Sequence, residues 1–234
     1  MSNYLYFKYA SYGFLIIAGI ASLLSQMYVQ SSYQKFSRIS TVSGRTGADV
    51  ARKILDDKGI YDVNVVESKA GVLSDHYDPT KKIVALSPNV YHDDSIASIS
   101  VAAHEVGHAI QHAESYHFIG LRNKILPYAI ISSKFSFIPI MLGFMADNDS
   151  LFNLGIIMLS VIALFQLVTL PVEFDASRRA VKILNQDQIL MDSELSGSKK
   201  MLTAAALTYV AALFGTVMSI LRYIAMNNNR KNNS

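Results

Sequence analysis

The sequence predicts a mostly helical membrane protein, with about four transmembrane helices and a small α+β domain that faces water. Of its 234 residues, 51% are hydrophobic and only 17% are charged, whereas an ordinary soluble domain carries roughly 25% charged residues. The charges are missing in blocks, so that apolar stretches alternate with two polar regions of ordinary charge density. The net charge of +3 is too small to indicate a nucleic-acid partner. Because there is no cysteine, a metal would have to be held by nitrogen and oxygen atoms.

The first apolar stretch lies near the amino terminus. Residues 9–29 contain no charge and have about the length of a helix that crosses a bilayer. A cleaved signal peptide is the alternative, but its apolar core has about 7–15 residues and follows a more basic segment than the single Lys8 found here. We therefore expect residues 1–30 to form a retained N-terminal transmembrane anchor.

Three further apolar stretches of spanning length follow, at residues 125–146, 151–172 and 201–220. We expect the first two to form a transmembrane hairpin, 125–172, and the third to begin a C-terminal helix with a polar tail, 201–234. Lys134 must then face protein, a water-filled cavity or the membrane surface. The alternative for each stretch is a buried helix of a soluble protein, but four such stretches in one short chain favour the membrane.

Two polar regions remain, at residues 31–124 and 173–200. The connection between the second and third spans carries only two aspartates as charges, whereas basic residues flank both polar regions. Because Lys and Arg concentrate on the cytoplasmic side of membrane proteins, we expect both regions in the cytoplasm. Arg230 and Lys231 would then lie outside, a mild conflict that leaves open a re-entrant fourth stretch.

The larger polar region is expected to fold as a helix, two strands and a second helix. Thr46 is predicted to cap an amphipathic helix. Residues 60–66 alternate apolar and polar side chains as a strand does, and residues 82–86 form a second short strand after a turn. A helix of about twenty residues is expected to begin at Asp94. This order predicts a small α+β module attached to the membrane helices.

The long helix contains the sequence His-Glu-Val-Gly-His at residues 104–108, an HExxH motif. His104 and His108 lie one helical turn apart on the same face, so both imidazoles can converge on one Zn²⁺ ion. Glu105 is then placed to take a proton from a water molecule at the metal. Gly107 keeps this face uncrowded where another element must approach. The alternative is an amphipathic helix whose two histidines and Glu105 are ordinary surface residues.

A catalytic zinc site needs a third protein ligand and an open position for water. His112 lies one further turn along the same face, but three successive turns of one straight helix cannot surround a single ion. Glu173 is the better candidate, because two spans, an even number, separate it from His108 and return the chain to the same side of the membrane. The alternative is that Glu173 is an ordinary charge beside the membrane.

Four blocks of the sequence resemble one known family: TGADVA (46–51), LSDHYDP (73–79), AHEVGHAIQH (103–112) and VEFDASRRA (172–180). They are similar to the YugP-type membrane zinc metallopeptidases, and with the spans around them they cover nearly the whole chain. The wider group, which includes the HtpX and prenyl-protein proteases, binds zinc beside the membrane through HExxH and a later glutamate. The resemblance therefore implies one zinc ion at His104, His108 and Glu173, with Glu105 catalytic.

The sequence departs from this wider group at one place. The group usually has an aspartate four residues after the third ligand, whereas Ser177 stands there in this chain. An aspartate that orients a zinc ligand is therefore missing at that position. Asp175 is the substitute that we consider.

The predicted function is a membrane-embedded zinc metalloendopeptidase that hydrolyses peptide bonds near the cytoplasmic surface of the cell membrane. Its catalytic module is then a zincin-like cytoplasmic domain, and Glu105 is its general base. Its partners are the lipid bilayer and polypeptide substrates, membrane proteins among them. The strand at residues 82–86 is a hypothetical sheet edge that binds an extended peptide. Four side chains are candidate donors to the developing oxyanion: His76, Tyr77, Tyr91 and Arg178.

Two other functions are weighed against this one. In an intramembrane site-2-type protease the HExxH motif lies inside the bilayer, but the apolar run before it, residues 96–103, is too short and too polar to span. A catalytically idle membrane scaffold or transport component, with zinc only pinning its helices, is the alternative from another class. A structural zinc site of that kind would be closed by a fourth protein ligand and would gain nothing from Glu105.

Overall fold

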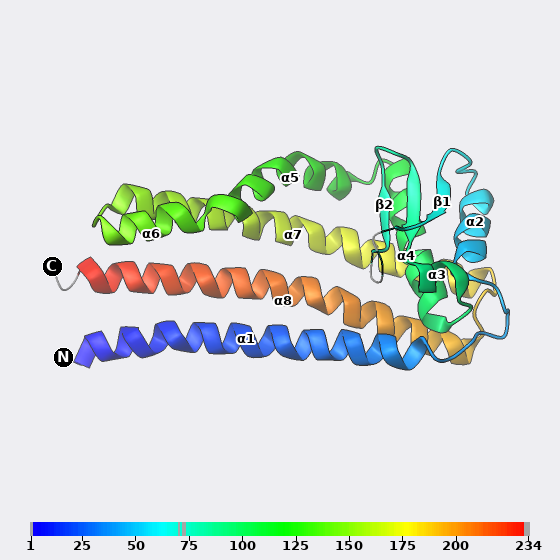
Figure 1. The fold of residues 1–234 in the computed structure, drawn as a ribbon, viewed down its shortest axis with the longest axis horizontal. Helices are drawn as coiled ribbons and strands as arrows, with labels where there is room; N and C mark the ends of the chain where they lie inside the picture. Colours follow the sequence, from blue (N-terminus) through cyan, green and yellow to red (C-terminus); the bar gives the residue numbers. More distant parts are fainter. Residues whose placement is uncertain (1, 70, 72–73, 232–234) are drawn as a thin grey trace. The chain divides into compact units, whose positions relative to one another are not determined.

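The structure is a computed structural model that describes residues 2–69, 71 and 74–231. Residue 1 of the predicted anchor, residue 73 of the LSDHYDP block and the last three residues of the polar tail lie outside this range. The elements follow one another along the chain (Figure 1) as α1 (Ser2–Phe36), α2 (Gly47–Asp57), β1 (Asn64–Glu67), β2 (His76–Asp78), β3 (Ile83–Leu86), α3 (Pro88–His92), α4 (Ile96–Ala113), α5 (His117–Phe135), α6 (Phe137–Met145), α7 (Asp149–Gln186) and α8 (Asp192–Lys231).

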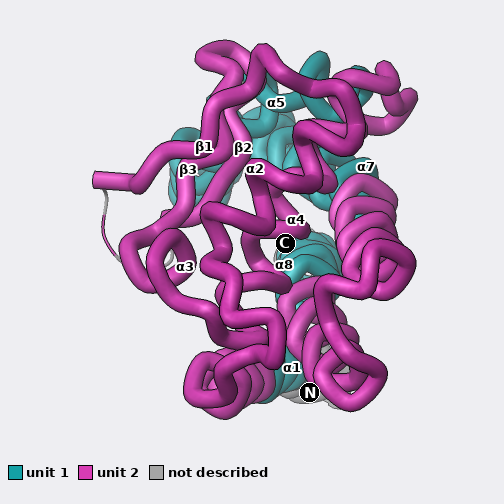
Figure 2. The backbone as a smooth tube through the Cα atoms, turned by 90° about the vertical axis from the view of Figure 1, so that its right-hand side faces the viewer, with its two compact units in different colours: residues 1–26, 120–170, 208–234 teal, residues 27–119, 171–207 magenta. Residues whose placement is uncertain are grey.

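The chain divides into two compact units, which Figure 2 colours differently. One unit, here called the helical unit, consists of three pieces: Met1–Gln26, Gly120–Leu170 and Thr208–Ser234. The other, here called the mixed unit, consists of Met27–Ile119 and Pro171–Leu207 and contains all three strands. Helices α1, α7 and α8 each contribute one part to the helical unit and another part to the mixed unit.

Among the described residues, three helices are long and apolar enough to cross a membrane: residues 12–36 of α1, α7, and residues 192–228 of α8. Helices α5 and α6 together form a fourth candidate, bent by 43° at a short break. These helices agree with the predicted mostly helical protein that contains about four apolar segments of spanning length. The bend is a difference from the sequence-based expectation, because residues 125–146 were expected to form one uninterrupted span.

Two glycines let α6 pack closely against α7 within the helical unit. Chain direction changes at Ser136, and α6 then turns back into α7 after a short connection. A side chain on Gly143 would collide with the backbone of Phe152, and one on Gly155 would collide with Ile140. The two glycines therefore allow α6 and α7 to approach closely. Helix α8, by contrast, is uninterrupted, so the bend lies in the second apolar stretch and not in the fourth.

The mixed unit contains a three-stranded sheet in the order β1-β3-β2. Strand β3 pairs in parallel with β1 and antiparallel with β2, so that Val84 lies between Val65 and Tyr77. The hypothesis that residues 82–86 form a free sheet edge is therefore wrong, because both sides of β3 are already paired. Strand β2 was not predicted from the sequence, since Asp78 and the residues after it had been interpreted as a turn.

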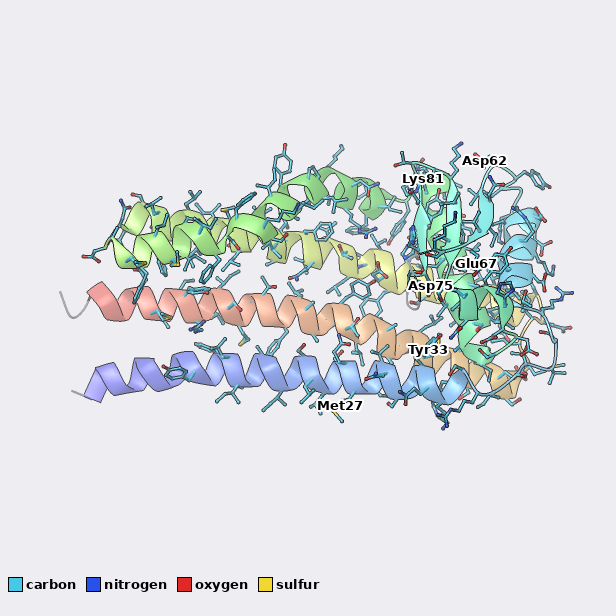
Figure 3. The ribbon with its side chains drawn as sticks, in the orientation of Figure 1. Met27, Tyr33, Asp62, Glu67, Asp75 and Lys81 are labelled. Atoms are coloured by element: carbon cyan, nitrogen blue, oxygen red, sulfur yellow. The ribbon has the colours of Figure 1, made fainter. Side chains whose placement is uncertain are left out.

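Helices α2 and α4 pack together with this sheet around the core of the mixed unit. The predicted cap of α2 is present as a capping box, in which Thr46 and Asp49 each bond the other's backbone N–H. Apolar side chains from α2, the sheet and α4 are fully buried, Ile54, Val84 and Ile99 among them. Charged side chains of the mixed unit, such as Asp62 and Glu67, lie around the strands (Figure 3). This packing fixes the position of α4, which begins at Ile96 after its cap Ser95, two residues later than expected.

Candidate zinc and catalytic site

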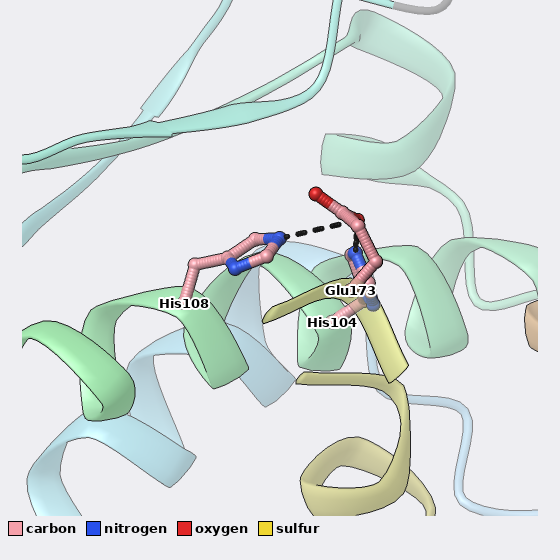
Figure 4. Close-up of side chains that lie close together, drawn as sticks. All are labelled: His104, His108 and Glu173. Atoms are coloured by element: carbon pink, nitrogen blue, oxygen red, sulfur yellow. Dashed lines mark ion pairs between the residues drawn. The ribbon is translucent and has the colours of Figure 1, made fainter. Parts of the chain in front are cut away.

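Helix α4 supplies the two histidines of the HExxH motif. The rings of His104 and His108 have centroids 4.7 Å apart and lie edge to face, with an angle of 83° between their planes. This is the arrangement expected for residues one helical turn apart on one face. Both Nε2 atoms point toward the same carboxylate in Figure 4.

That carboxylate belongs to Glu173, from the part of α7 that lies in the mixed unit. Its Oε2 atom lies 3.4 Å from Nε2 of His104 and 3.7 Å from Nε2 of His108. Glu173 is only 3% exposed. A buried carboxylate between two imidazoles is not an ordinary charge beside the membrane, so the structure brings together the three ligands that the sequence predicts.

These three side chains fit the requirements of a zinc ion. Their nearest donor atoms all lie within 4.8 Å of one another. Tetrahedral zinc with bonds of about 2.0–2.1 Å separates its donor atoms by about 3.3 Å, so the distance of 3.4 Å between His104 and Glu173 matches and that of 3.7 Å between His108 and Glu173 is slightly longer. Within the part of the chain that the structure describes, the group contains three possible ligands and no fourth. Two imidazole nitrogens and one carboxylate oxygen are the donor set of several catalytic zinc sites.

Gly107 is the residue that lets α7 come close enough to α4. A Cβ atom at this position would lie 2.8 Å from the carbonyl oxygen of Ala176 and 3.2 Å from its Cα. Both are backbone atoms of α7, so they cannot rotate away as a flexible side chain could. The expectation that Gly107 leaves room for an approaching element is confirmed, and the element is the helix that carries Glu173.

The electrostatics of the site show how strongly these groups interact. Burial by itself would lower the pKa of His108, because it disfavours the charged imidazolium. The nearby carboxylate of Glu173, 3.7 Å from Nε2, outweighs burial together with the negative charge of Glu105 and the hydrogen bond between Nδ1 and Gln111, so the pKa of His108 is raised. Glu105 is only 9% exposed, so water screens its negative charge little, and this charge contributes to the raised pKa of His108.

The other nitrogen of each histidine has a partner of its own. Nδ1 of His104 lies 3.2 Å from the hydroxyl of Ser177, the residue that replaces the aspartate of the wider group. Nδ1 of His108 lies 3.0 Å from Oε1 of Gln111. Asp175, considered as a substitute for the missing aspartate, contacts neither histidine directly and instead accepts a hydrogen bond of 2.9 Å from Nε2 of Gln111.

Sequence reasoning missed Gln111. A signal was present, because residues three apart on a helix are neighbours, and Gln111 follows His108 by three positions. A glutamine at this spacing is nevertheless common on helices that bind no metal. Only its complete burial and its contacts with α7 distinguish it.

The structure places the remaining candidates elsewhere. His112 does not belong to the group of converging ligands; it is exposed, and its Nδ1 atom lies 3.2 Å from the hydroxyl of Tyr77. Nδ1 of His76 lies 2.7 Å from the carbonyl oxygen of Ser74. The ring of Tyr91 packs edge-on against His92, and Arg178 is exposed.

Two histidines of an HExxH helix and a later glutamate on a second helix, in a chain with helices of spanning length, define a membrane zinc metallopeptidase. Residues 11–228 match the model of the family described as "Putative neutral zinc metallopeptidase", and the chain belongs to this family. It is 47% identical over 212 residues to the "Putative membrane protease YugP" of Bacillus subtilis (strain 168). The aligned region covers 90% of this chain and 94% of that protein. No solved structure matches the chain significantly. The resemblance drawn from the four sequence blocks is therefore confirmed.

Proposed function

We propose that this protein is a metalloendopeptidase that hydrolyses peptide bonds of polypeptides near the cytoplasmic surface of the cell membrane. One zinc ion is held by His104, His108 and Glu173, and Glu105 is the general base. The observation that carries this proposal is the convergence of three buried or half-buried ligands from two helices, without a fourth ligand among the described residues. A fourth position that the protein does not fill is the mark of a catalytic zinc site.

When bound, zinc would acidify a water molecule and polarise a peptide carbonyl. The chain's own residues then have two tasks. His104, His108 and Glu173 hold the ion beside Glu105, whose carboxylate takes the proton from the attacking water and passes it to the nitrogen of the leaving amine. Because Glu105 is nearly buried, its interactions with these groups are stronger than they would be in bulk water.

The alternative function is a catalytically idle scaffold in which zinc only pins α4 to α7. Such a site requires neither an open coordination position nor an acidic residue next to the first histidine. The described part of the chain offers three ligands and places the nearly buried Glu105 next to them, which favours the peptidase.

Substitution of Glu105 separates these two functions. We expect Glu105→Gln to keep zinc bound and to lower the rate of cleavage of an unstructured protein by about 10²–10⁴-fold, the usual contribution of a general base. Glu67→Gln is the matched control, because Glu67 is an exposed glutamate of the same unit that pairs with His92. Zinc content and peptide release are measured on purified protein in detergent. Full activity of Glu105→Gln would exclude the proposed role of this residue.

A chelator provides the complementary test. Activity is expected to disappear when zinc is removed and to return when zinc is added back, because the three ligands cannot activate water by themselves. A protein that cleaves equally well in both states would contradict the proposed zinc dependence. A protein that binds zinc but cleaves no substrate under any condition would support the scaffold instead.

A further inference from the structure

Gln111 occupies an unusual position for an amide side chain. It is completely buried, and both ends of its amide are used. The nitrogen, Nε2, donates one hydrogen bond of 2.8 Å to the backbone carbonyl of Val172 and another of 2.9 Å to Oδ2 of Asp175. The oxygen, Oε1, faces Nδ1 of His108 at 3.0 Å. The amide therefore connects a zinc ligand on α4 with two acceptors on α7.

The chemistry of these partners determines which way the amide points. A backbone carbonyl can only accept a hydrogen bond, and an ionised carboxylate can likewise only accept. If the amide of Gln111 were turned over, its oxygen would face two other oxygens and its nitrogen would face the histidine. The end that meets Val172 and Asp175 must therefore be the NH₂ group, so the orientation follows from the hydrogen-bond network itself.

Arg179 holds the carboxylate of Asp175 in the position in which it meets Gln111. Its Nε atom donates a hydrogen bond of 2.5 Å to Oδ2 of Asp175, and its Nη1 atom donates one of 2.6 Å to Glu114. Because a guanidinium group can only donate, Oδ2 of Asp175 is an acceptor on both sides, toward Arg179 and toward Gln111. Because Glu114 is the C-cap residue of α4, the same arginine also ties α7 back to the helix of the histidines.

The consequence for His108 follows directly. Since Oε1 of Gln111 can only accept, Nδ1 of His108 must carry the proton, and the lone pair of the neutral ring lies on Nε2. Nε2 is the atom that lies 3.7 Å from Glu173 and converges on the proposed zinc position. The hydroxyl of Ser177 can donate or accept, so it imposes no such choice on His104.

We propose that Gln111 is a positioning residue that fixes the metal-binding tautomer and the ring orientation of His108, and that Asp175 and Arg179 fix the orientation of Gln111. This inference rests on the proposed zinc site and deepens it. It also gives Asp175 a role in place of the missing aspartate: it acts on the second histidine through an amide and not on the first histidine directly.

The tautomer is measured without metal and without activity. Protein labelled with ¹⁵N in histidine is studied by NMR in detergent, free of zinc and at a pH at which the imidazoles are neutral. In the parent protein we expect His108 to carry its proton on Nδ1. In Gln111→Met, which replaces the amide by an apolar chain of similar length, we expect both tautomers of His108. Asp175→Asn, which leaves Gln111 in place, is expected to shift the ratio in the same direction but less.

The zinc dissociation constant is the second readout, from competition with a chromophoric chelator. We expect Gln111→Met to raise it by about 10–100-fold, the usual effect of removing a group that orients a metal ligand. Ser100→Ala is the control. Ser100 also lies on α4, and the substitution removes its buried hydrogen bond of 2.7 Å to Ser198 of α8 without changing a metal ligand. It should leave both the tautomer and the dissociation constant unchanged.

Three outcomes would overturn the proposal. The first is a parent protein in which His108 is protonated on Nε2. The second is a Gln111→Met variant that keeps both the tautomer and the zinc affinity of the parent. The third is a loss of zinc affinity in Ser100→Ala as large as that in Gln111→Met. If Gln111→Met does not fold, Asp175→Asn decides, and an unchanged tautomer in that variant overturns the proposal. A parent protein that has the expected tautomer but cleaves no peptide would contradict the proposed peptidase and leave this inference intact.

Discussion

At the scale of single residues, the site depends on which side chains converge and which only lie nearby. Glu173 contacts both histidines of the motif, whereas His112, the other candidate for the third ligand, pairs with Tyr77. The preference for Glu173 could be predicted from the sequence, because a straight helix cannot wrap three successive turns around one ion. The role of Gln111 could not, since hydrogen bonds to α7 decide it and no local spacing encodes them.

Zinc affinity distinguishes Glu173 from His112 as the third ligand. We expect Glu173→Ala to raise the zinc dissociation constant by more than about 100-fold, because groups that merely orient a ligand already contribute about 10–100-fold. His112→Ala should leave it within about two-fold of the parent value, since His112 lies outside the converging group. Chelator competition measures both. Comparable losses in the two variants would mean that His112 takes part in metal binding.

At the scale of elements, the site depends on how closely α4 and α7 approach. The sequence predicts α2 and α4 well, because Thr46 and the apolar periodicity mark helices locally. It predicts the sheet less well. Strand β2 has only three residues, and β3 is central because β1 and β2, which precede it, both pair with it. The periodicity of a short segment does not show which strands pair with one another.

Gly107 gives a prediction at this scale. We expect Gly107→Ala to destabilise the protein by about 1–3 kcal/mol, the usual cost of an overpacked contact, because the added Cβ meets the backbone of Ala176. Zinc binding should weaken as well, since α7 carries Glu173. Gly120→Ala is the control: Gly120 is also helical, and an added Cβ there meets nothing within 4 Å. Thermal unfolding and zinc titration measure both variants, and a Gly107→Ala protein as stable as the parent would contradict the close approach.

At the scale of the whole molecule, the chain has to return to the side from which it came. The mixed unit contains residues 27–119 and residues 171–207. The segment between these two pieces, residues 120–170, belongs to the helical unit. If α7 crosses the bilayer, the bent pair of α5 and α6 must cross it too, because His108 and Glu173 meet in one unit. An even number of crossings was predicted from the sequence, and the convergence of the ligands agrees with it.

The side of the membrane is tested by labelling, which the absence of cysteine makes simple. Tyr61 in the mixed unit and Met145 at the end of α6 are 74% and 75% exposed. We expect a membrane-impermeant maleimide to label Met145→Cys in intact cells and Tyr61→Cys only after permeabilisation, because the positions of the basic residues predict that the polar regions are cytoplasmic. The reverse pattern would place the site outside the cell. Labelling of both positions in intact cells would show that α5 and α6 do not cross the membrane between them.

The sequence by itself determined the apolar segments of spanning length, the HExxH helix and the family, because each depends on length, periodicity or a run of adjacent residues. It also pointed to Glu173 through the even number of spans. Only the tertiary structure decided that α4 and α7 touch at Gly107, and that Gln111 reaches Asp175, 64 residues away in the sequence. The physical reason is that helical periodicity specifies which residues share a face, whereas the packing of two distant helices specifies which faces meet.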